Sequence, residues 1–194
     1  MPAQPADRAF SAENAPTAGP VCPEAPRWCP HAALPAYRHV PSVTPHPVTD
    51  PRGHSHGQAE SSPPDLPPEA WRDNEAYLWA IDLYNQGYLW ESHEVWEGLW
   101  RAAGRGSRQG QFYQGLIFNS AAQLKVLTGR LRGAATHGQR SLHRLEHAAA
   151  GEDVYMGLSL PSLTAALRTY YAPLWETPPG PPRTKPPCLI PRLG

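Results

Sequence analysis

The chain has 194 residues, enough for one domain with a hydrophobic core and additional segments. Its 17 basic and 17 acidic residues cancel, so no overall field attracts nucleic acid or a membrane surface, and we expect neither as a partner. No stretch reaches the ~18 apolar residues of a membrane-spanning helix, and residues 1–16 lack the pattern of a signal peptide. Three scattered cysteines do not indicate a disulfide framework, so we expect a soluble protein in the reducing cytoplasm.

Proline usage divides the chain into parts. Sixteen of the 25 prolines lie in residues 1–68 and nine lie from Pro161 onward, so that residues 69–160 contain none. Because proline interrupts helices, a long proline-free block between proline-rich flanks is typical of a helical domain with irregular arms. We predict four parts, which are disorder over residues 1–33, an extended Pro/His-rich arm and linker over 34–67, a helical bundle over 68–172 and a Pro-rich tail over 173–194.

The block from residue 69 to 172 shows helical periodicity. Apolar residues recur at spacings of three and four, and glycines stand where one helix should end and the next begin. No alternation typical of strands occurs there, which predicts the all-α class and a small antiparallel bundle of about five helices. The helices are expected at about 68–86, 88–103, 107–128, 131–149 and 161–171. Gly115, inside the third helix, predicts close approach of a neighbouring helix.

Charged residues are segregated along these helices. Six acids and no Lys or Arg occur from Asp73 to Glu97, whereas eight bases and no acid occur from Gly98 to Leu145. We expect the acidic helices to lie beside the basic ones and to neutralise them. The alternative is a basic surface for phosphates or RNA, but the basic helices lack interleaved stacking aromatics.

The stretch ESHEVWEGLW, residues 91–100, contains the strongest candidate site. On a helix, His93, Glu97 and Trp100 stand at i, i+4 and i+7 and therefore share one face. Glu94 lies beside this face, and Gln114 is a polar group in the otherwise apolar third helix. The candidate polar site therefore comprises His93, Glu94, Glu97, Trp100 and Gln114. No substrate follows from this set, so no residue is assigned a catalytic role and the chain is not assigned as an enzyme.

Several interpretations of the His93–Glu97 pair stay open. The pair can fix helix packing in a structural or protein-interaction module. It can instead bind a divalent metal, or act as an acid–base pair in a pocket for a small polar ligand. A His and a Glu supply only half of a metal's ligands, and Glu94, Glu91 or a histidine of the arm could supply the others. We predict that the arm docks on the bundle and adds His46, His54 or His56. The competing prediction is a disordered arm.

The residues around this pair resemble a known family. HEVWEGLW fits the pattern HxxxExxW, and LYNQGYLWES before it and FYQGLIFNSAAQL after it strengthen the likeness. The chain thus resembles the domain of unknown function 309 family over about residues 69–145, and its arm resembles the leader of longer bacterial members. The resemblance implies a helical bundle and no established activity. Its motif positions are His93, Glu97 and Trp100, with Glu94, Gln114 and Gly115 matching more loosely.

Overall fold

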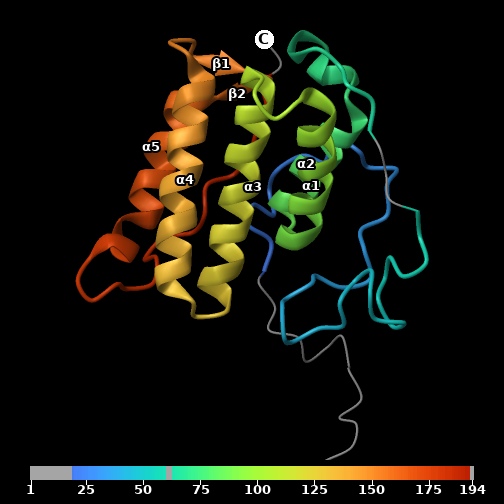
Figure 1. Cartoon of the computed structure of the whole chain (residues 1–194), viewed down its shortest axis with the longest axis horizontal. Helices are drawn as coiled ribbons and strands as arrows, with labels where there is room; N and C mark the ends of the chain where they lie inside the picture. Colours follow the sequence, from blue (N-terminus) through green and yellow to red (C-terminus); the bar gives the residue numbers. More distant parts are fainter. Residues whose placement is uncertain (1–18, 60–62, 193–194) are drawn as a thin grey trace, which may run out of the picture.

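Five α-helices form the body of the described chain, residues 19–59 and 63–192 of the computed structural model (Figure 1). They are α1 (Glu75–Asn85), α2 (Leu89–Ala103), α3 (Arg108–Leu127), α4 (Leu131–Ala149) and α5 (Leu160–Tyr171). Short 3-10 helices flank them, η2 (Pro68–Asp73) before α1 and η3 (Ala172–Trp175) after α5. The strands found in these residues are β1 (Val154–Tyr155) and β2 (Leu158–Ser159), which form a small antiparallel hairpin. The all-α prediction is confirmed.

The helix boundaries follow local signals in the sequence. The side chain of Asn74 accepts a hydrogen bond from the Tyr77 amide and so caps the start of α1. Gly87 has a φ of 80°, a conformation that glycine adopts at low cost, and it ends α1. Four predicted helices match the structure to within one residue at each end. The first, predicted over 68–86, is split because Asn74 begins a new helix.

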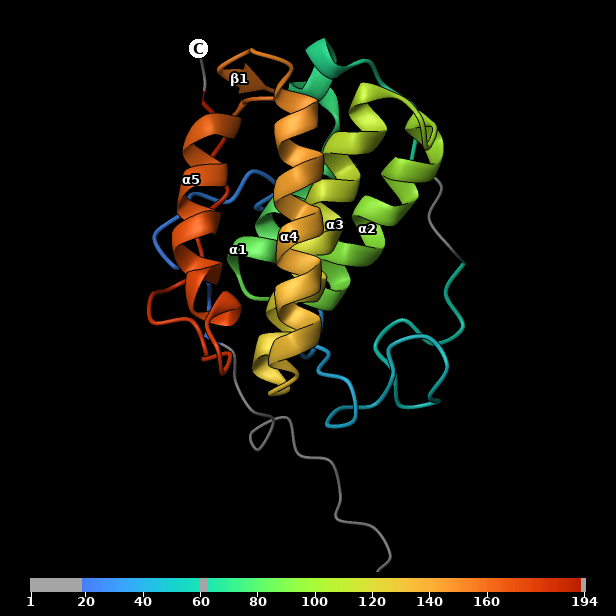
Figure 2. The ribbon, with the colours of Figure 1, turned by 60° about the vertical axis from the view of Figure 1, so that its left-hand side comes forward.

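Helix α3 lies at the centre of the packing and makes its largest contacts with α4 and α2. Figure 2 shows α4 running directly alongside α3. A Cβ atom at Gly115 would lie 2.7 Å from Cγ of Leu145, and the Ser141 hydroxyl donates to the Gly115 carbonyl over 2.8 Å. The predicted close approach at Gly115 is therefore confirmed, with α4 as the neighbour. Within the described residues, no helix combines the length and the apolar character needed to cross a membrane.

A buried polar network joins α1, α3 and α5 inside the bundle. The Asn119 side chain donates to the Tyr84 hydroxyl (3.1 Å) and accepts from the Tyr171 hydroxyl (2.7 Å). Gln123 also donates to Tyr84, over 2.6 Å. Burial raises the pKa of Tyr84 to about 12, so its hydroxyl keeps its proton at neutral pH. These hydrogen bonds fix the relative positions of three helices.

Residues 19–33, which we expected to be disordered, lie against α1. The buried carboxylate of Asp82 accepts hydrogen bonds from the backbone amides of Trp28 (2.9 Å) and Cys29 (2.8 Å). Val21 and Cys29 belong to the hydrophobic core. The expectation is wrong for this stretch. A side chain of α1 holds its backbone in place, and this contact leaves no pattern in the sequence of the stretch itself. Residues 1–18, the rest of the predicted disorder, lie outside the described residues.

The Pro-rich tail also packs on α1. Asn85 binds Leu189 twice, with Oδ1 accepting from its amide (2.9 Å) and Nδ2 donating to its carbonyl (2.7 Å). Cys188, next to Leu189, forms a disulfide with Cys22. This bond was not predicted, because partners separated by 166 residues leave no spacing signal. Disulfides are typical of oxidising compartments, so this bond does not support the reducing, cytoplasmic setting that we expected.

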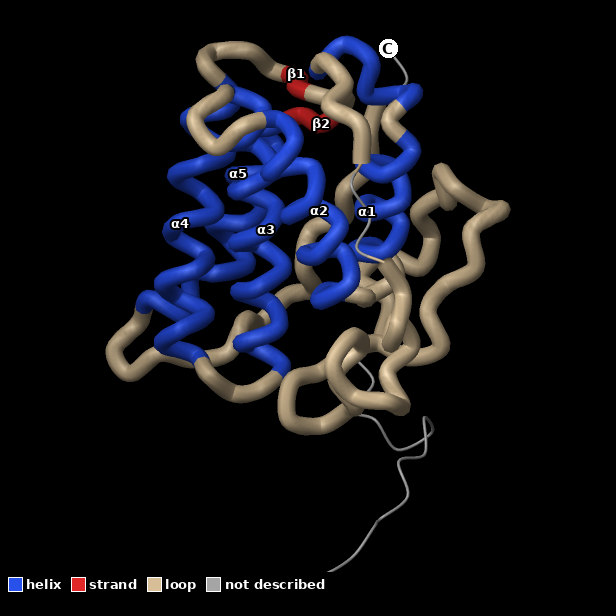
Figure 3. The backbone as a smooth tube through the Cα atoms, turned by 45° about the vertical axis from the view of Figure 1, so that its right-hand side comes forward, coloured by secondary structure: helices blue, strands red, loops and turns tan. Residues whose placement is uncertain are grey.

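Residues 34–59 form turns and not the extended arm that we predicted. The Gly53 amide donates to the Asp50 carbonyl (2.8 Å), and the Val40 amide donates to the Thr44 hydroxyl (3.0 Å). Proline fixes its own φ and restricts the residue before it, and both restrictions are compatible with a chain of turns. Figure 3 shows this segment as loops beside α1 and α2. We call residues 34–59 the arm.

Candidate functional site

The side chains of His93 and Glu97 meet on α2, as their i, i+4 spacing predicts. Nε2 of His93 lies 3.2 Å from Oε1 of Glu97, and the two side chains are 22% and 34% exposed. The other oxygen of Glu97 lies 3.8 Å from Nη1 of Arg101. The pair is therefore accessible from outside the core, and each carboxylate oxygen of Glu97 faces a different basic group.

Glu94 completes a group of three metal-type donors with this pair. One ligand atom each from His93, Glu94 and Glu97 lie within 4.8 Å of one another. The hydrogen bond from His93 lowers the pKa of Glu97, so this carboxylate stays ionised. Surrounding protein atoms partly desolvate Glu94 and raise its pKa, although its side chain still contacts solvent. The two carboxylates thus have pKa values that are shifted in opposite directions.

Trp100 and Gln114 make no hydrogen bond to this group within the described residues. Trp100 is half-buried, and the guanidinium of Arg105 lies 5.0 Å from the centre of its ring. Its indole Nε1 is buried without a hydrogen-bond partner in the described chain. Gln114 is half-buried on α3. The sequence therefore located the helix that carries the site, whereas a role for Trp100 or Gln114 stays a prediction.

The arm binds to α2 one turn before the donor group. Glu91, at the start of α2, is only 5% exposed. Its Oε1 accepts a hydrogen bond from the His39 amide (2.8 Å) and lies 3.0 Å from Nε2 of His54. A buried carboxylate needs such partners, and Glu91 thereby holds two parts of the arm on the bundle.

The arm histidines do not complete the predicted metal site. His54 is held by Glu91, His46 packs against the ring of Trp90 at 5.3 Å, and His56 binds the carbonyl of Val48 within the arm. The structure brings Glu94 to the His93–Glu97 pair, and it does not bring His46, His54 or His56. Glu91 binds His54 instead, which keeps this imidazole away from the donor group.

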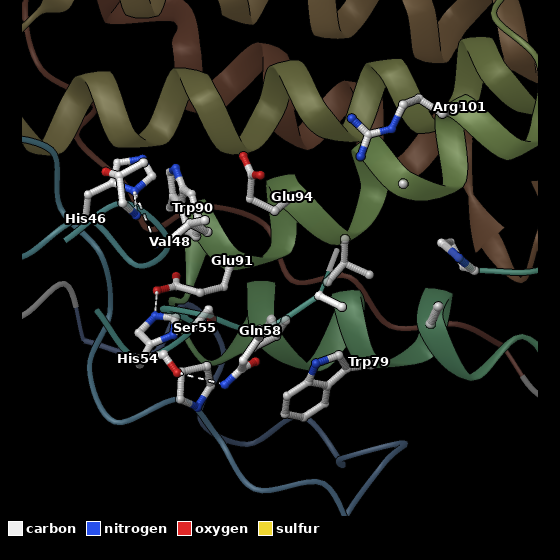
Figure 4. Close-up of a pocket in the computed structure, with 18 residues that line it drawn as sticks. His46, Val48, His54, Ser55, Gln58, Trp79, Trp90, Glu91, Glu94 and Arg101 are labelled. Carbon is white, nitrogen blue, oxygen red and sulfur yellow. Dashed lines mark hydrogen bonds and ion pairs between the residues drawn. The ribbon is translucent and has the colours of Figure 1, made fainter. Parts of the chain in front are cut away.

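A pocket of about 590 Å³ lies between the arm and helices α1 and α2, and we call it the arm pocket. Carboxylates, imidazoles and indoles line it, among them Glu91, Glu94, His46, His54, Trp79 and Trp90. Figure 4 shows His54 joined to Glu91 at one end, with Trp79 and Arg101 toward the other. Its volume is typical of sites for small molecules.

A second pocket, of about 170 Å³, lies where α2, α3 and α4 meet, and we call it the helix pocket. His93 lines it from α2, and His137 lines it from α4. Burial lowers the pKa of His137, and nearby Lys125 lowers it further. Since Glu94 lines the arm pocket and His93 lines the helix pocket, the donor group stands between the two.

The charges around the site are arranged differently from our expectation. Within the described residues, no ion pair joins an acid of α1 or α2 to a base of α3 or α4. The acids pair instead with docked segments or within α2, as Arg27 with Asp82, His31 with Glu75, His54 with Glu91, and His93 and Arg101 with Glu97. The described residues thus show no direct ion pair of the kind that neutralisation between these helices would form, and Lys125 of α3 and His137 of α4 face the helix pocket.

Sequence reasoning missed His137 and the anchoring role of Glu91. His137 stands three residues after Ala134 and four before Ser141, and both of these are fully buried. That spacing places it on the face of α4 that contacts α3. Helical periodicity could therefore have found His137, whereas nothing in the sequence indicates that Glu91 binds the arm.

The family described as Domain of unknown function (DUF309) matches residues 77–137. The chain carries a DUF309 domain. The match confirms the resemblance suggested by HxxxExxW, and the DUF309 domain extends from α1 into α4 without the arm. No curated protein and no solved structure matches the chain.

Proposed function

We propose that the DUF309 domain binds one divalent metal ion through His93, Glu94 and Glu97. The observation that carries the proposal is the convergence of one imidazole and two carboxylates within 4.8 Å on an accessible face of α2. Bonds from zinc to His and Glu are about 2 Å long. Small side-chain rotations would therefore let all three donors reach one ion.

The donor set favours ions such as Zn²⁺, Mn²⁺ or Fe²⁺, which accept both imidazole and carboxylate ligands. Three protein ligands leave at least one coordination position for water or for a small polar ligand. The arm pocket, which Glu94 lines, has room for such a ligand. This arrangement is typical of an exchangeable metal centre and not of a closed structural one.

The second candidate is a structural pair that only fixes the packing of α2. In its favour, His93 and Glu97 already satisfy each other through a direct hydrogen bond of 3.2 Å. Against it, both side chains keep contact with solvent, and His93 lines a pocket. A pair that served packing alone would gain most if it were closed inside the core.

Metal analysis and zinc titration of the full chain test the proposal. Purified protein without a tag, stripped with a chelator, should bind about one Zn²⁺ per chain, measured by calorimetry and elemental analysis. His93→Ala and Glu97→Gln should each weaken binding by about tenfold or more. His143→Ala on α4 and Glu69→Gln in η2 replace exposed residues of the same types and should change nothing. Equal zinc affinity in all four variants would reject the metal site.

A further inference from the structure

The helix pocket gathers four basic side chains from different parts of the fold. His93 comes from α2, Lys125 from α3 and His137 from α4, while Arg130 stands in the turn between α3 and α4. No Asp or Glu is present among the described residues that line it. Within the same residues, neither Lys125 nor Arg130 forms an ion pair with a carboxylate. Lys125 and Arg130 therefore give the pocket two positive charges, while the carboxylate of Glu97 lies against the other side of the His93 ring.

Two imidazole nitrogens at this pocket have unused hydrogen-bonding capacity. Nδ1 of His93 and Nδ1 of His137 are both buried, and neither finds a partner in the described chain. Buried polar atoms are normally paired, because an unpaired one destabilises the fold. A ligand with several oxygen atoms could accept a hydrogen bond from Nδ1 of His137, because a neutral imidazole can carry its proton on that nitrogen.

Of the two helix ends beside the pocket, the start of α4 has the polarity that favours an anion, whereas the end of α3 has the opposite polarity. The last carbonyls of α3 are occupied, with Leu124 accepting from the Thr128 amide (3.1 Å) and Lys125 accepting from the Arg130 amide (2.8 Å). Helix α4 begins after Arg130 without a side-chain cap, so no capping side chain accepts hydrogen bonds from its first amides. The positive end of α4 therefore favours an anion at the pocket.

We propose that the helix pocket binds the phosphate group of a small molecule, or free inorganic phosphate. Lys125 and Arg130 supply two permanent charges, which suit a dianion better than a single carboxylate, and the planar guanidinium can bind two oxygens at once. Pro41, Trp90 and Leu124 close the pocket with apolar surface. Its volume of about 170 Å³ fits a phosphate group and a few further atoms, not a nucleic-acid strand. The site extends beyond the metal centre and shares only His93 with it.

Calorimetric titration of the metal-free full chain with inorganic phosphate tests this site. We expect binding in the millimolar range or tighter, weakened about tenfold by Lys125→Met and by Arg130→Gln. Lys185→Met and Arg132→Gln are the matched controls, since both residues are exposed and neither lines the pocket. Lys125→Arg keeps the charge and should bind phosphate nearly as well as the original chain. Circular dichroism of each variant identifies any that fails to fold.

A parallel titration with glycerol 3-phosphate separates the two sources of the phosphate. Binding of both ligands assigns the site to the phosphate group of a metabolite, and binding of inorganic phosphate alone assigns it to the free ion. The proposal is overturned if the original chain binds neither ligand, or if Lys125→Met and Arg130→Gln bind them as well as their controls. Binding that requires added Zn²⁺ also overturns it, because the anion would then be a metal ligand. Phosphate binding in a chain that takes up no zinc would reject only the metal proposal.

Discussion

The helical bundle and the segments docked on it are held together in different ways. The backbone of the bundle is bonded within its own helices, and its side chains pack by periodic stripes. The docked segments have no helix or strand over residues 19–59 and 176–192, and a few buried side chains of α1 and α2 hold their backbone. Asp82, Asn85 and Glu91 are the main ones. Stability is therefore distributed in the bundle and concentrated at a few residues in the docked segments.

The largest expected loss comes from removing one of these concentrated anchors. Asp82→Ala leaves the buried amides of Trp28 and Cys29 without an acceptor, and we expect it to lower the free energy of unfolding by about 3 kcal/mol. Asp82→Asn keeps one acceptor oxygen and should lose less. Urea denaturation gives both values. Asp73→Ala, at an exposed position in η2, is the control. If Asp82→Ala lost no more stability than this control, Asp82 would not be an anchor of the docked segment.

A substitution that crowds the interior of the bundle should lower the free energy of unfolding somewhat less than Asp82→Ala does. In Gly115→Ala the new Cβ would lie 2.7 Å from Cγ of Leu145 and 3.2 Å from its backbone nitrogen, so α3 and α4 must move apart. We expect a loss of about 2 kcal/mol, measured by the same denaturation. Gly106→Ala has open space around it and should be nearly neutral. If both variants were equally stable, the close contact between α3 and α4 would not exist.

A milder substitution at Glu91, which holds the arm on α2, should loosen the arm while the bundle stays folded. Glu91→Gln keeps an oxygen for the His39 amide but removes the charge facing His54, so we expect a loss of about 1 kcal/mol. Limited proteolysis should cut the arm of this variant sooner than the arm of the original chain. Arm cleavage at the rate of a Glu69→Gln control would show that Glu91 is not the anchor.

The smallest expected effect is on the pH dependence of metal binding. Because desolvation raises the pKa of Glu94, a proton competes with the metal for this carboxylate at a higher pH than for an ordinary Glu. Zinc affinity should therefore fall as the pH decreases through that raised pKa. Glu94→Gln should bind zinc more weakly and show a flatter decline on the acid side. Parallel curves for the two proteins, measured by calorimetry at several pH values, would remove Glu94 from the donor group.

The contrast between the helical bundle and the docked segments also explains how much of the structure could be predicted from the sequence. Helix ranges follow from local periodicity and from residues such as Asn74 and Gly87, so the bundle could be predicted almost to the residue. The meeting of His93 with Glu97 follows from helix geometry alone. Contacts between segments far apart in the chain have no comparable signal. The binding of His54 by Glu91, and of Leu189 by Asn85, therefore could not be predicted.

The helix pocket could be predicted from the sequence only in part. Each basic residue that lines it could be placed on a helix or in a turn from the sequence. Their convergence depends on how α2, α3 and α4 are rotated about their axes, which the apolar stripes only partly define. From the segregation of charged residues along the sequence, we expected acids of α1 and α2 to neutralise the bases of α3 and α4. Those acids instead bind the docked segments, as Asp82 does through Arg27.

The bond between Cys22 and Cys188 turns most of this molecule into a covalent ring. All five α-helices, the arm and both pockets lie on that ring. A protease that cuts once in the exposed turn at Gly104–Gly106 would open the ring without releasing a fragment. The product would be two polypeptides that remain joined through the disulfide between Cys22 and Cys188. Its two halves would stay at a high effective concentration, and two cuts would be needed before any part could leave.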